Sequence, residues 1–206
     1  MGLKEATAGL HSKAEKTQFS QLIFSGTIPE QEYAYYLFNM YHIHNALENK
    51  YELPHPSLNR CKSIEKDLGG LIKLKMDLTE STKKYIEYIN TLTEEQWKAH
   101  IYVNYLAIVY GGQMIKSKVP GLGAYYNIDN MQECVGAIRA FLTDDMSDEA
   151  NKGFQFNIDV LDNIWRTLRP NGIWELGNYE TVAQTATAIN INPMGGNKAP
   201  INLGRL

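Results

Sequence analysis

His11 is a candidate metal ligand because of the residues that a helix would place beside it. In the segment LKEATAGLHSKAE, positions seven and three before His11 and four after it share one helical face. Ala8 leaves room there for a flat ligand, and Lys4 can reach an anionic edge of such a ligand. Glu15 can accept a hydrogen bond from one imidazole nitrogen and so orient the other toward a metal ion held by that ligand. The competing interpretation is an exposed or capping histidine near a chain end.

Gly111 and Gly112 form a pair inside a strongly helical run, where each glycine costs about 1 kcal/mol relative to alanine. Removing the side chains lets a backbone approach a planar ligand closely and lets the helix bend. The neighbours on the face of Gly111 are apolar, namely Ala107, Ile108 and Ile115. The pair therefore predicts a ligand-facing surface, with close helix packing as the structural alternative.

A stripe of mostly aromatic residues recurs at helical spacing between residues 33 and 51. Its members are Tyr33, Leu37, Met40, Tyr41, His44, Leu47 and Tyr51. A stripe of this kind usually packs in a core. His42 and His44 point to different faces of a regular helix, so they cannot chelate one metal ion together.

The elements that position these residues are predicted to be helices, because helical periodicity is strong along the chain and strand signals are weak. Gly26 is expected to close a short helix, and Thr27 with Glu30 forms a capping-box pattern that would open the next one. Thr93 with Gln96 forms a second such pattern. The expected helices cover about 3–16, 19–25, 28–52, 62–67, 71–89, 94–116, 131–142 and 148–168.

The predicted architecture is all-α, a single-domain helical bundle. Residues 1–170 form the helical domain in this interpretation. Residues 171–206 are rich in Ala, Thr, Asn, Gly and Pro and show little amphipathic period, so we expect an irregular C-terminal extension.

Composition excludes several classes of function. The net charge of -3 lacks the basic excess that nucleic-acid binding requires. Cys61 and Cys134 are far apart and outside any CxxC spacing, which argues against a disulfide framework or a structural zinc site. No apolar stretch approaches the roughly 20 residues that cross a bilayer. We therefore expect a soluble, cytoplasmic protein that binds neither membrane nor nucleic acid; the oligomeric state is not predicted.

Four segments in order and in register resemble the heme oxygenase family. They are LKEATAGLHSKAE, FSQLIFSGTIPEQEYAYYLFNMYHIHNALE, YLAIVYGGQMIK and EANKGFQFNIDVLDNI, which together cover most of residues 3 to 166. The resemblance implies a heme oxygenase-like helical bundle that holds heme b between its first helix and a kinked glycine helix. It implies oxidative opening of heme at the α-meso carbon, with molecular oxygen as co-substrate, to give biliverdin, carbon monoxide and ferrous iron.

The resemblance also assigns roles to individual positions. His11 would be the proximal iron ligand, and the backbone at Gly111 and Gly112 would lie over the distal face of heme. Contacts to the heme propionates would come from Lys4, Tyr102 and Arg139, because charge-assisted pairs bind carboxylates. Phe154 and Asn157 match late-helix residues that line the distal pocket.

The sequence departs from the family pattern on the distal helix. The family has an aspartate there that holds a water network for proton delivery, whereas this chain has Ile108, which cannot hold water. An arginine of that helix is also missing, with Asn104 nearby. His44 replaces a tyrosine of the same network. Our hypothesis is that His44, with Asn157 and Tyr105, organises the distal water, because a histidine that titrates near neutrality can relay a proton.

Three functions remain open at this point. The first is a heme-degrading monooxygenase that takes electrons from a small donor such as ferredoxin. The second is a heme-binding or heme-sequestering protein that lost catalysis with its distal carboxylate. The third is another enzyme on the same scaffold, such as a thiamine-degrading enzyme or a diiron oxidase, which would need a nucleophilic cysteine or a carboxylate cluster.

Overall fold

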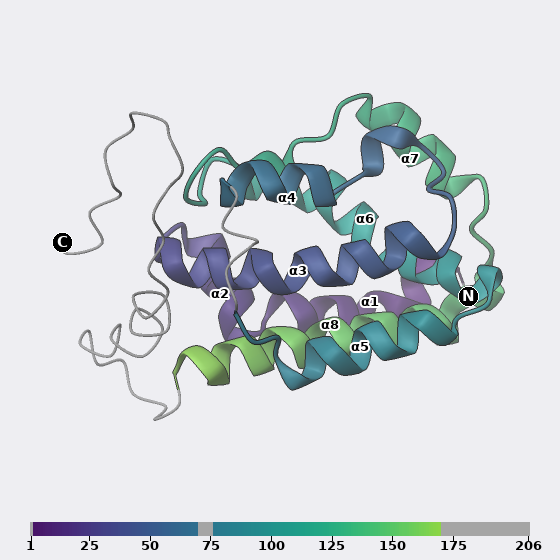
Figure 1. The fold of residues 1–206 in the computed structure, drawn as a ribbon. Helices are drawn as coiled ribbons and strands as arrows, with labels where there is room; N and C mark the ends of the chain where they lie inside the picture. Colours follow the sequence, from purple (N-terminus) through teal and green to yellow (C-terminus); the bar gives the residue numbers. More distant parts are fainter. Residues whose placement is uncertain (1, 70–75, 170–206) are drawn as a thin grey trace, which may run out of the picture. The chain divides into compact units, whose positions relative to one another are not determined.

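The computed structural model describes residues 2–69 and 76–169, and this part of the chain contains helices and connecting loops but no β-strand (Figure 1). The all-α prediction is confirmed. The α-helices are α1 (Leu3–Glu15), α2 (Gln18–Ser25), α3 (Glu30–Lys50), α4 (Cys61–Leu68), α5 (Glu80–Thr91), α6 (Glu94–Ile115), α7 (Met131–Arg139) and α8 (Ser147–Leu168). Short 3-10 turns are η1 (Pro56–Leu58), η3 (Ala124–Tyr126) and η4 (Asp144–Met146).

Helix α3 passes through the centre of the main hydrophobic core. It packs against α4, α5 and α8, so it is covered on several sides (Figure 1). Most of the predicted stripe is buried, and Tyr35, Phe38 and Asn39, which lie outside it, are buried as well. Burial depends on how many neighbours surround a helix, which its own periodicity does not report.

Two of the predicted helix ends are confirmed, whereas the predicted start of α3 is wrong. Thr93 and Gln96 form the expected capping box at the start of α6. Gly26 ends α2 in the left-handed conformation, with φ of 74°. The capping box expected at Thr27 does not form, because Pro29 precedes the first residue of α3 and the Thr27 hydroxyl pairs with Ser25 instead, at 2.7 Å.

The start of α5 lies later than predicted. The helix begins at Glu80, where the Thr79 hydroxyl accepts a hydrogen bond from the backbone N–H of Thr82. Part of the helix expected over 71–89 and the extension expected over 171–206 lie outside the described residues.

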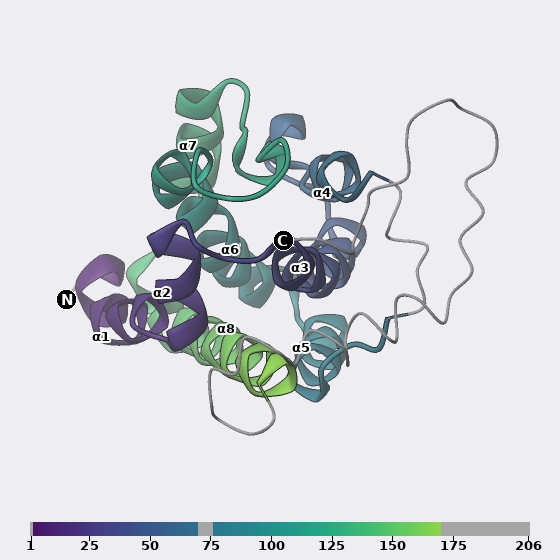
Figure 2. The ribbon, with the colours of Figure 1, turned by 90° about the vertical axis from the view of Figure 1, so that its left-hand side faces the viewer.

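Helix α8 supports the two helices that carry His11 and the glycine pair. It packs against α1, α2, α5 and α6, and Figure 2 shows α1 and α6 on either side of it. A second hydrophobic cluster fills the junction of α1, α6 and α8, with contributions from η4; its buried members are Leu3, Ala99, Val103, Met146, Ala150 and Phe154. The first helix, which carries His11, is thus held against the glycine helix by a small core of its own.

Candidate functional site

A cavity of about 940 Å³ lies between α1 and α6 and extends to α2, α3, η3, α7 and α8. Its size and mixed lining are typical of small-molecule sites. Nine of the twelve residues singled out from the sequence line it: Lys4, His11, Glu15, Tyr102, Ile108, Gly111, Arg139, Phe154 and Asn157. Gly112, His44 and Tyr105 are not among the lining residues.

His11 forms one wall of the cavity, and its side chain is about half exposed. Its Nδ1 lies 3.8 Å from the Glu15 carboxylate, and its ring meets the edge of Phe154 with 5.5 Å between centroids. Within the described part of the chain, no hydrogen bond involves His11 Nε2. This nitrogen is therefore open to a ligand in the cavity.

Helix α1 is held in place by polar contacts at its start. The backbone N–H of Leu3 donates to Asp144 at 2.9 Å, and Asp144 belongs to η4. The buried Thr7 hydroxyl lies 3.2 Å from the Tyr102 hydroxyl on α6. These contacts fix the position of α1, and therefore of His11, relative to α6.

The two glycines of α6 face different surroundings. A Cβ at Gly111 would have no atom within 4 Å, so the backbone there faces open cavity. A Cβ at Gly112 would lie 3.0 Å from Cδ1 and 3.2 Å from Cβ of Tyr126. Gly111 therefore leaves space for a ligand, whereas Gly112 allows η3 to pack closely against α6.

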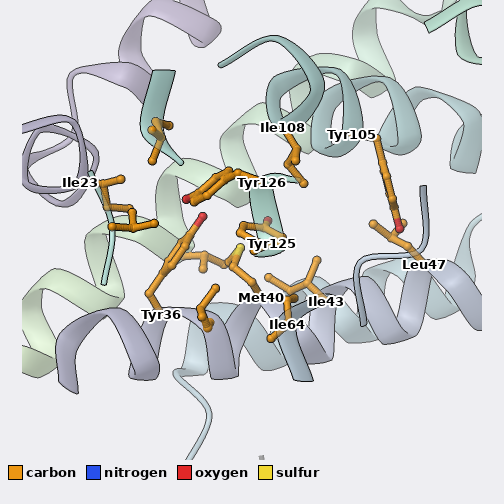
Figure 3. Packing of buried hydrophobic residues seen from close by; sticks show 14 of the residues in the cluster. Ile23, Tyr36, Met40, Ile43, Leu47, Ile64, Tyr105, Ile108, Tyr125 and Tyr126 are labelled. Atoms are coloured by element: carbon orange, nitrogen blue, oxygen red, sulfur yellow. The ribbon is translucent and has the colours of Figure 1, made fainter. Parts of the chain in front are cut away.

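The inner part of the cavity is lined by tyrosines that the sequence analysis did not single out. Tyr36, Tyr125 and Tyr126 line it together with Ile108. Figure 3 shows the three tyrosine rings close together beside Ile108. Burial raises the pKa of all three phenols, so each keeps its proton at neutral pH. They are neutral hydrogen-bonding groups in an otherwise apolar region.

Two charged side chains hold η3 against the cavity. Asp67 accepts hydrogen bonds from the backbone N–H groups of Ala124 and Tyr125, both at 2.8 Å. The buried Arg60 donates to the backbone oxygens of Tyr125 and Asn127, at 3.0 and 2.9 Å. Local sequence around the tyrosines gives no sign of these partners, which explains why the tyrosines were missed.

Cys134 is not an accessible nucleophile. Its side chain is fully buried, and burial raises the pKa of the thiol. The sulfur lies 3.4 Å from Nδ1 of His55, a histidine that also accepts the backbone N–H of Ser57. A reactive thiolate needs access and a lowered pKa, so this site does not favour the cysteine-dependent alternative.

The comparison with protein families decides the assignment. A model of the family described as heme oxygenase matches residues 1–132 of the chain. The chain belongs to the heme oxygenase family. Heme oxygenase 2 of Macaca fascicularis is 27% identical over 201 residues, which cover 79% of this chain and 64% of that protein. The heme oxygenase of Guillardia theta is 30% identical over 157 residues, covering 64% of this chain and 66% of that protein. The chain thus spans less than two thirds of these relatives' length.

Solved heme oxygenase structures share the fold. Heme oxygenase-2 from Synechocystis sp. PCC 6803, in complex with heme and NO, superposes with a TM-score of 0.71 at 21% identity, over 88% of this chain and 90% of that chain. Heme oxygenase-1 from the same cyanobacterium, in complex with heme, gives a TM-score of 0.68 at 22% identity, over 80% and 93%. The helical bundle is therefore that of a heme oxygenase.

The burial and the titration of His44 differ from what the proton-relay hypothesis assumed. It is buried behind the cavity lining, where its Nε2 lies 2.9 Å from the Tyr125 hydroxyl. Burial, together with the charge of Arg60, lowers the pKa of His44 to about 3. The imidazole is therefore neutral at physiological pH, and its connection to the cavity passes through Tyr125.

Tyr105 also lies behind the cavity rather than on it. Its ring packs edge-on against His44, with 5.0 Å between centroids, and its hydroxyl donates to Glu48 at 3.2 Å. Any effect of His44 or Tyr105 on water in the cavity would therefore pass through the lining tyrosines. Their role in organising that water remains a hypothesis.

The outer end of the cavity carries basic side chains at the positions expected to contact propionates. Lys4 and Arg139 are exposed, and the Arg139 guanidinium lies 5.9 Å from the centre of the Tyr110 ring. Tyr110 is itself exposed on α6, one position before Gly111. Cationic groups near an opening can pair with ligand carboxylates while remaining solvated.

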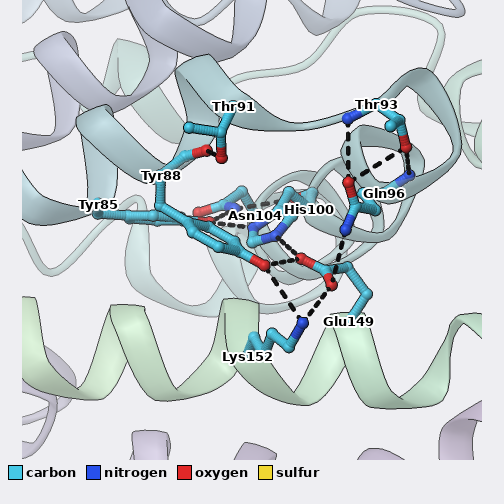
Figure 4. A network of polar contacts seen from close by, with 9 residues as sticks. All are labelled: Tyr85, Tyr88, Thr91, Thr93, Gln96, His100, Asn104, Glu149 and Lys152. Carbon is cyan, nitrogen blue, oxygen red and sulfur yellow. Dashed lines mark hydrogen bonds and ion pairs between the residues drawn. The ribbon is translucent and has the colours of Figure 1, made fainter.

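A polar network meets the cavity on the side of α8 (Figure 4). Asn104 and Asn157 line the cavity, and Asn157 Nδ2 donates to Asn104 Oδ1 at 3.2 Å. From Asn104 the network continues through Tyr85 and His100 to Glu149. The signal in the sequence was limited to Asn157 and to the absence of an arginine near Asn104.

None of the helices in the described residues is long and apolar enough to cross a membrane.

Proposed function

We propose that the protein degrades heme, opening the ring at the α-meso carbon to give biliverdin, carbon monoxide and ferrous iron. The observation that carries the proposal is that His11 and Gly111, from two different helices, line one cavity of about 940 Å³. Family membership and the shared fold support it. Heme b is then the substrate as well as the cofactor, and molecular oxygen is the co-substrate.

The residues present fit a heme. His11 offers an imidazole nitrogen that no group in the described residues occupies, and Gly111 leaves room where a side chain would meet a flat ligand. Lys4 and Arg139 are placed to pair with propionates at the outer end. When bound, heme supplies both the iron that activates oxygen and the ring that is oxidised.

The side chains around the cavity have distinct tasks in this proposal. Glu15 orients the His11 ring through Nδ1. Ile108 keeps its part of the wall dry, so polar contacts to water in the cavity fall to Asn157 and to the lining tyrosines. His44 positions the hydroxyl of Tyr125, since the imidazole stays neutral.

An external reductant is required, and we propose a small donor such as ferredoxin. The exposed Lys4 and Arg139 beside the cavity give that surface cationic groups that suit an acidic donor. A cytoplasmic location fits Cys61 and Cys134, which are both free thiols.

A second candidate function is heme binding or sequestration without turnover. Ile108 lines the cavity at the position where the family pattern has a carboxylate, and the low pKa of His44 removes the simplest replacement. Both functions require heme in the same cavity, and they differ only in the fate of the heme once it is reduced.

Titration of the heme-free protein with hemin tests the shared requirement. We expect one equivalent to bind with a histidine-ligated absorption spectrum, and this spectrum should be lost in His11→Ala. His42→Ala is the matched control, because His42 is half-buried on α3 and does not line the cavity. Unchanged hemin spectra in His11→Ala would refute the assigned ligand.

Addition of a reductant separates the two candidates. Ascorbate or a reductase with ferredoxin should bleach the Soret band of the hemin complex while bilin absorption appears. A stable Soret band under the same conditions would favour sequestration. Single-turnover rates of wild type and His44→Ala then test His44, and equal rates would remove it from the mechanism.

A further inference from the structure

The amide orientation of Asn104 is fixed by a backbone carbonyl. Asn104 Nδ2 lies 2.8 Å from the backbone oxygen of His100, which can only accept a hydrogen bond. The atom facing that oxygen must therefore be the NH₂ group and not Oδ1. This assignment follows from the chemistry of the two groups alone.

The orientation of Asn157 follows from that of Asn104. Asn104 Oδ1 is an acceptor, and it lies 3.2 Å from the side chain of Asn157. Asn157 must present its NH₂ group there, which turns its own Oδ1 away from Asn104. Within the described part of the chain, no side chain or backbone group donates to Asn157 Oδ1, and Asn157 lines the cavity.

The far end of the network enforces the same direction. Tyr85 oxygen accepts from Asn104 Nδ2 at 2.8 Å, so its own proton is directed to His100 Nδ1, also at 2.8 Å. His100 Nε2 then donates to Glu149 at 3.1 Å. Figure 4 shows these side chains in sequence from Asn104 to Glu149.

Glu149 is a carboxylate and so can only accept. Burial raises its pKa, but hydrogen bonds from His100, Lys152 and Tyr88 outweigh this effect and lower the pKa to about 2. A carboxylate at one end and a backbone carbonyl beside the other leave one consistent arrangement of donors, in which each hydrogen bond from Asn157 through Asn104, Tyr85 and His100 to Glu149 is donated in the direction away from the cavity.

We propose that Asn104 is a positioning residue that makes Asn157 present its carbonyl oxygen, a hydrogen-bond acceptor, to the cavity. That oxygen binds a donor such as a water molecule next to the ligand. An arginine at position 104 could only donate and would demand the opposite orientation of Asn157. Asparagine at position 104 therefore sets the polarity of this wall. Its consequence for heme chemistry rests on the proposed function, whereas the orientation itself does not.

Side-chain amide exchange in the heme-free protein tests the orientation directly. The Asn157 NH₂ signals are identified in ¹⁵N spectra by their loss in Asn157→Asp. We expect one of the two protons to exchange roughly tenfold more slowly than those of the exposed Asn90, because it is bonded to Asn104. Exchange of both protons as fast as in Asn90 would overturn the proposal.

Two substitutions distinguish positioning from a general structural role. Asn104→Leu removes the acceptor for Asn157, and both protons should exchange fast. Tyr85→Phe removes one partner of Asn104 but leaves its hydrogen bond to the His100 oxygen, so the slow proton should persist. Equal protection in Asn104→Leu and wild type would refute the role of Asn104, and loss of protection in a folded Tyr85→Phe would show that the His100 oxygen does not set the orientation.

Carbon monoxide bound to the reduced hemin complex reports the polarity that the ligand encounters. A nearby carbonyl oxygen disfavours electron density on the ligand oxygen and raises the C–O stretching frequency. Asn157→Leu should therefore lower this frequency, and Tyr85→Phe should leave it nearly unchanged. A frequency that is unchanged or raised in Asn157→Leu would show that Asn157 Oδ1 does not face the ligand. Failure to bind hemin would instead refute the proposed function, and the exchange measurement would still decide the orientation.

Discussion

The two adjacent glycines of α6 should respond oppositely to the same substitution. In Gly111→Ala the new methyl group meets no atom within 4 Å, so only the gain in helix propensity acts on the heme-free protein. That gain is about 1 kcal/mol. For a chain of this size it corresponds to a rise of roughly 2–4 °C in the melting temperature. The same methyl group projects into the cavity, where it should collide with a bound heme.

The cost to heme binding can be bounded from overpacking. Forcing an extra methyl group into a filled site costs about 1–3 kcal/mol. Hemin affinity of Gly111→Ala should therefore fall by roughly 5- to 150-fold. A variant that is more stable but binds its ligand more weakly identifies a glycine retained for function at the expense of stability.

Gly112→Ala is the matched comparison. Its methyl group would lie 3.0 Å from the Tyr126 ring, and Asp67 holds the backbone next to that ring, so the ring has little freedom to move. Overpacking of about 1–3 kcal/mol outweighs the propensity gain of about 1 kcal/mol, for a net loss of about 0–2 kcal/mol. Hemin affinity should change less than in Gly111→Ala.

Thermal unfolding followed by circular dichroism, together with absorbance titration with hemin, measures both quantities. The reasoning fails if Gly111→Ala binds hemin with wild-type affinity, because its backbone would then not face the ligand. It also fails if Gly111→Ala melts below the wild type, since the space described at this position would not exist.

Three further predictions concern stability. His44 stays unprotonated in the folded state down to a pKa of about 3, against 6.5 in an unfolded chain, so it makes stability fall as pH drops from 6.5 to 3. His44→Gln should remove up to about 1.4 kcal/mol per pH unit of this slope in urea unfolding at several pH values; identical slopes would contradict the buried neutral state. Asp67→Ala leaves two N–H groups of η3 without their acceptor, so it should lower the free energy of unfolding by about 1–3 kcal/mol and weaken hemin binding. Urea unfolding and hemin titration measure these effects, and wild-type values for both would show that η3 does not need the hydrogen bonds of Asp67. Thr93→Ala loses the α6 cap and should cost about 1 kcal/mol, with hemin affinity unchanged; an unchanged melting temperature would contradict it.

Features encoded by neighbouring residues could be predicted from the sequence. The left-handed end at Gly26 and the capping box at Thr93 depend on a few adjacent positions, and both are confirmed. The start of α5 was misplaced because Met76 and Leu78 continue the apolar pattern of the helix but lie in the loop before Glu80. The burial of α3 residues outside the predicted stripe depends on three other helices, which no local window contains.

The site shows the same division. His11 could be found from the residues beside it on its helical face, and Gly111 from the glycine pair inside a helical run. Both also match a family pattern. The inner tyrosines Tyr125 and Tyr126 could not, since Arg60 and Asp67 bring them to the cavity from another part of the chain. The low pKa of His44 likewise has its cause in burial and in Arg60, so its residue type alone suggested the wrong titration behaviour.

The central position of α3 couples the cavity to the whole molecule. Because neighbours cover this helix on several sides, its backbone amides can exchange with solvent only when the entire bundle opens, and they should be the slowest in the chain. Tyr36 and Met40 belong to this helix and also line the cavity. Substitutions that reshape that inner wall therefore draw on global stability, whereas those on α1, which has few buried side chains, leave it nearly intact.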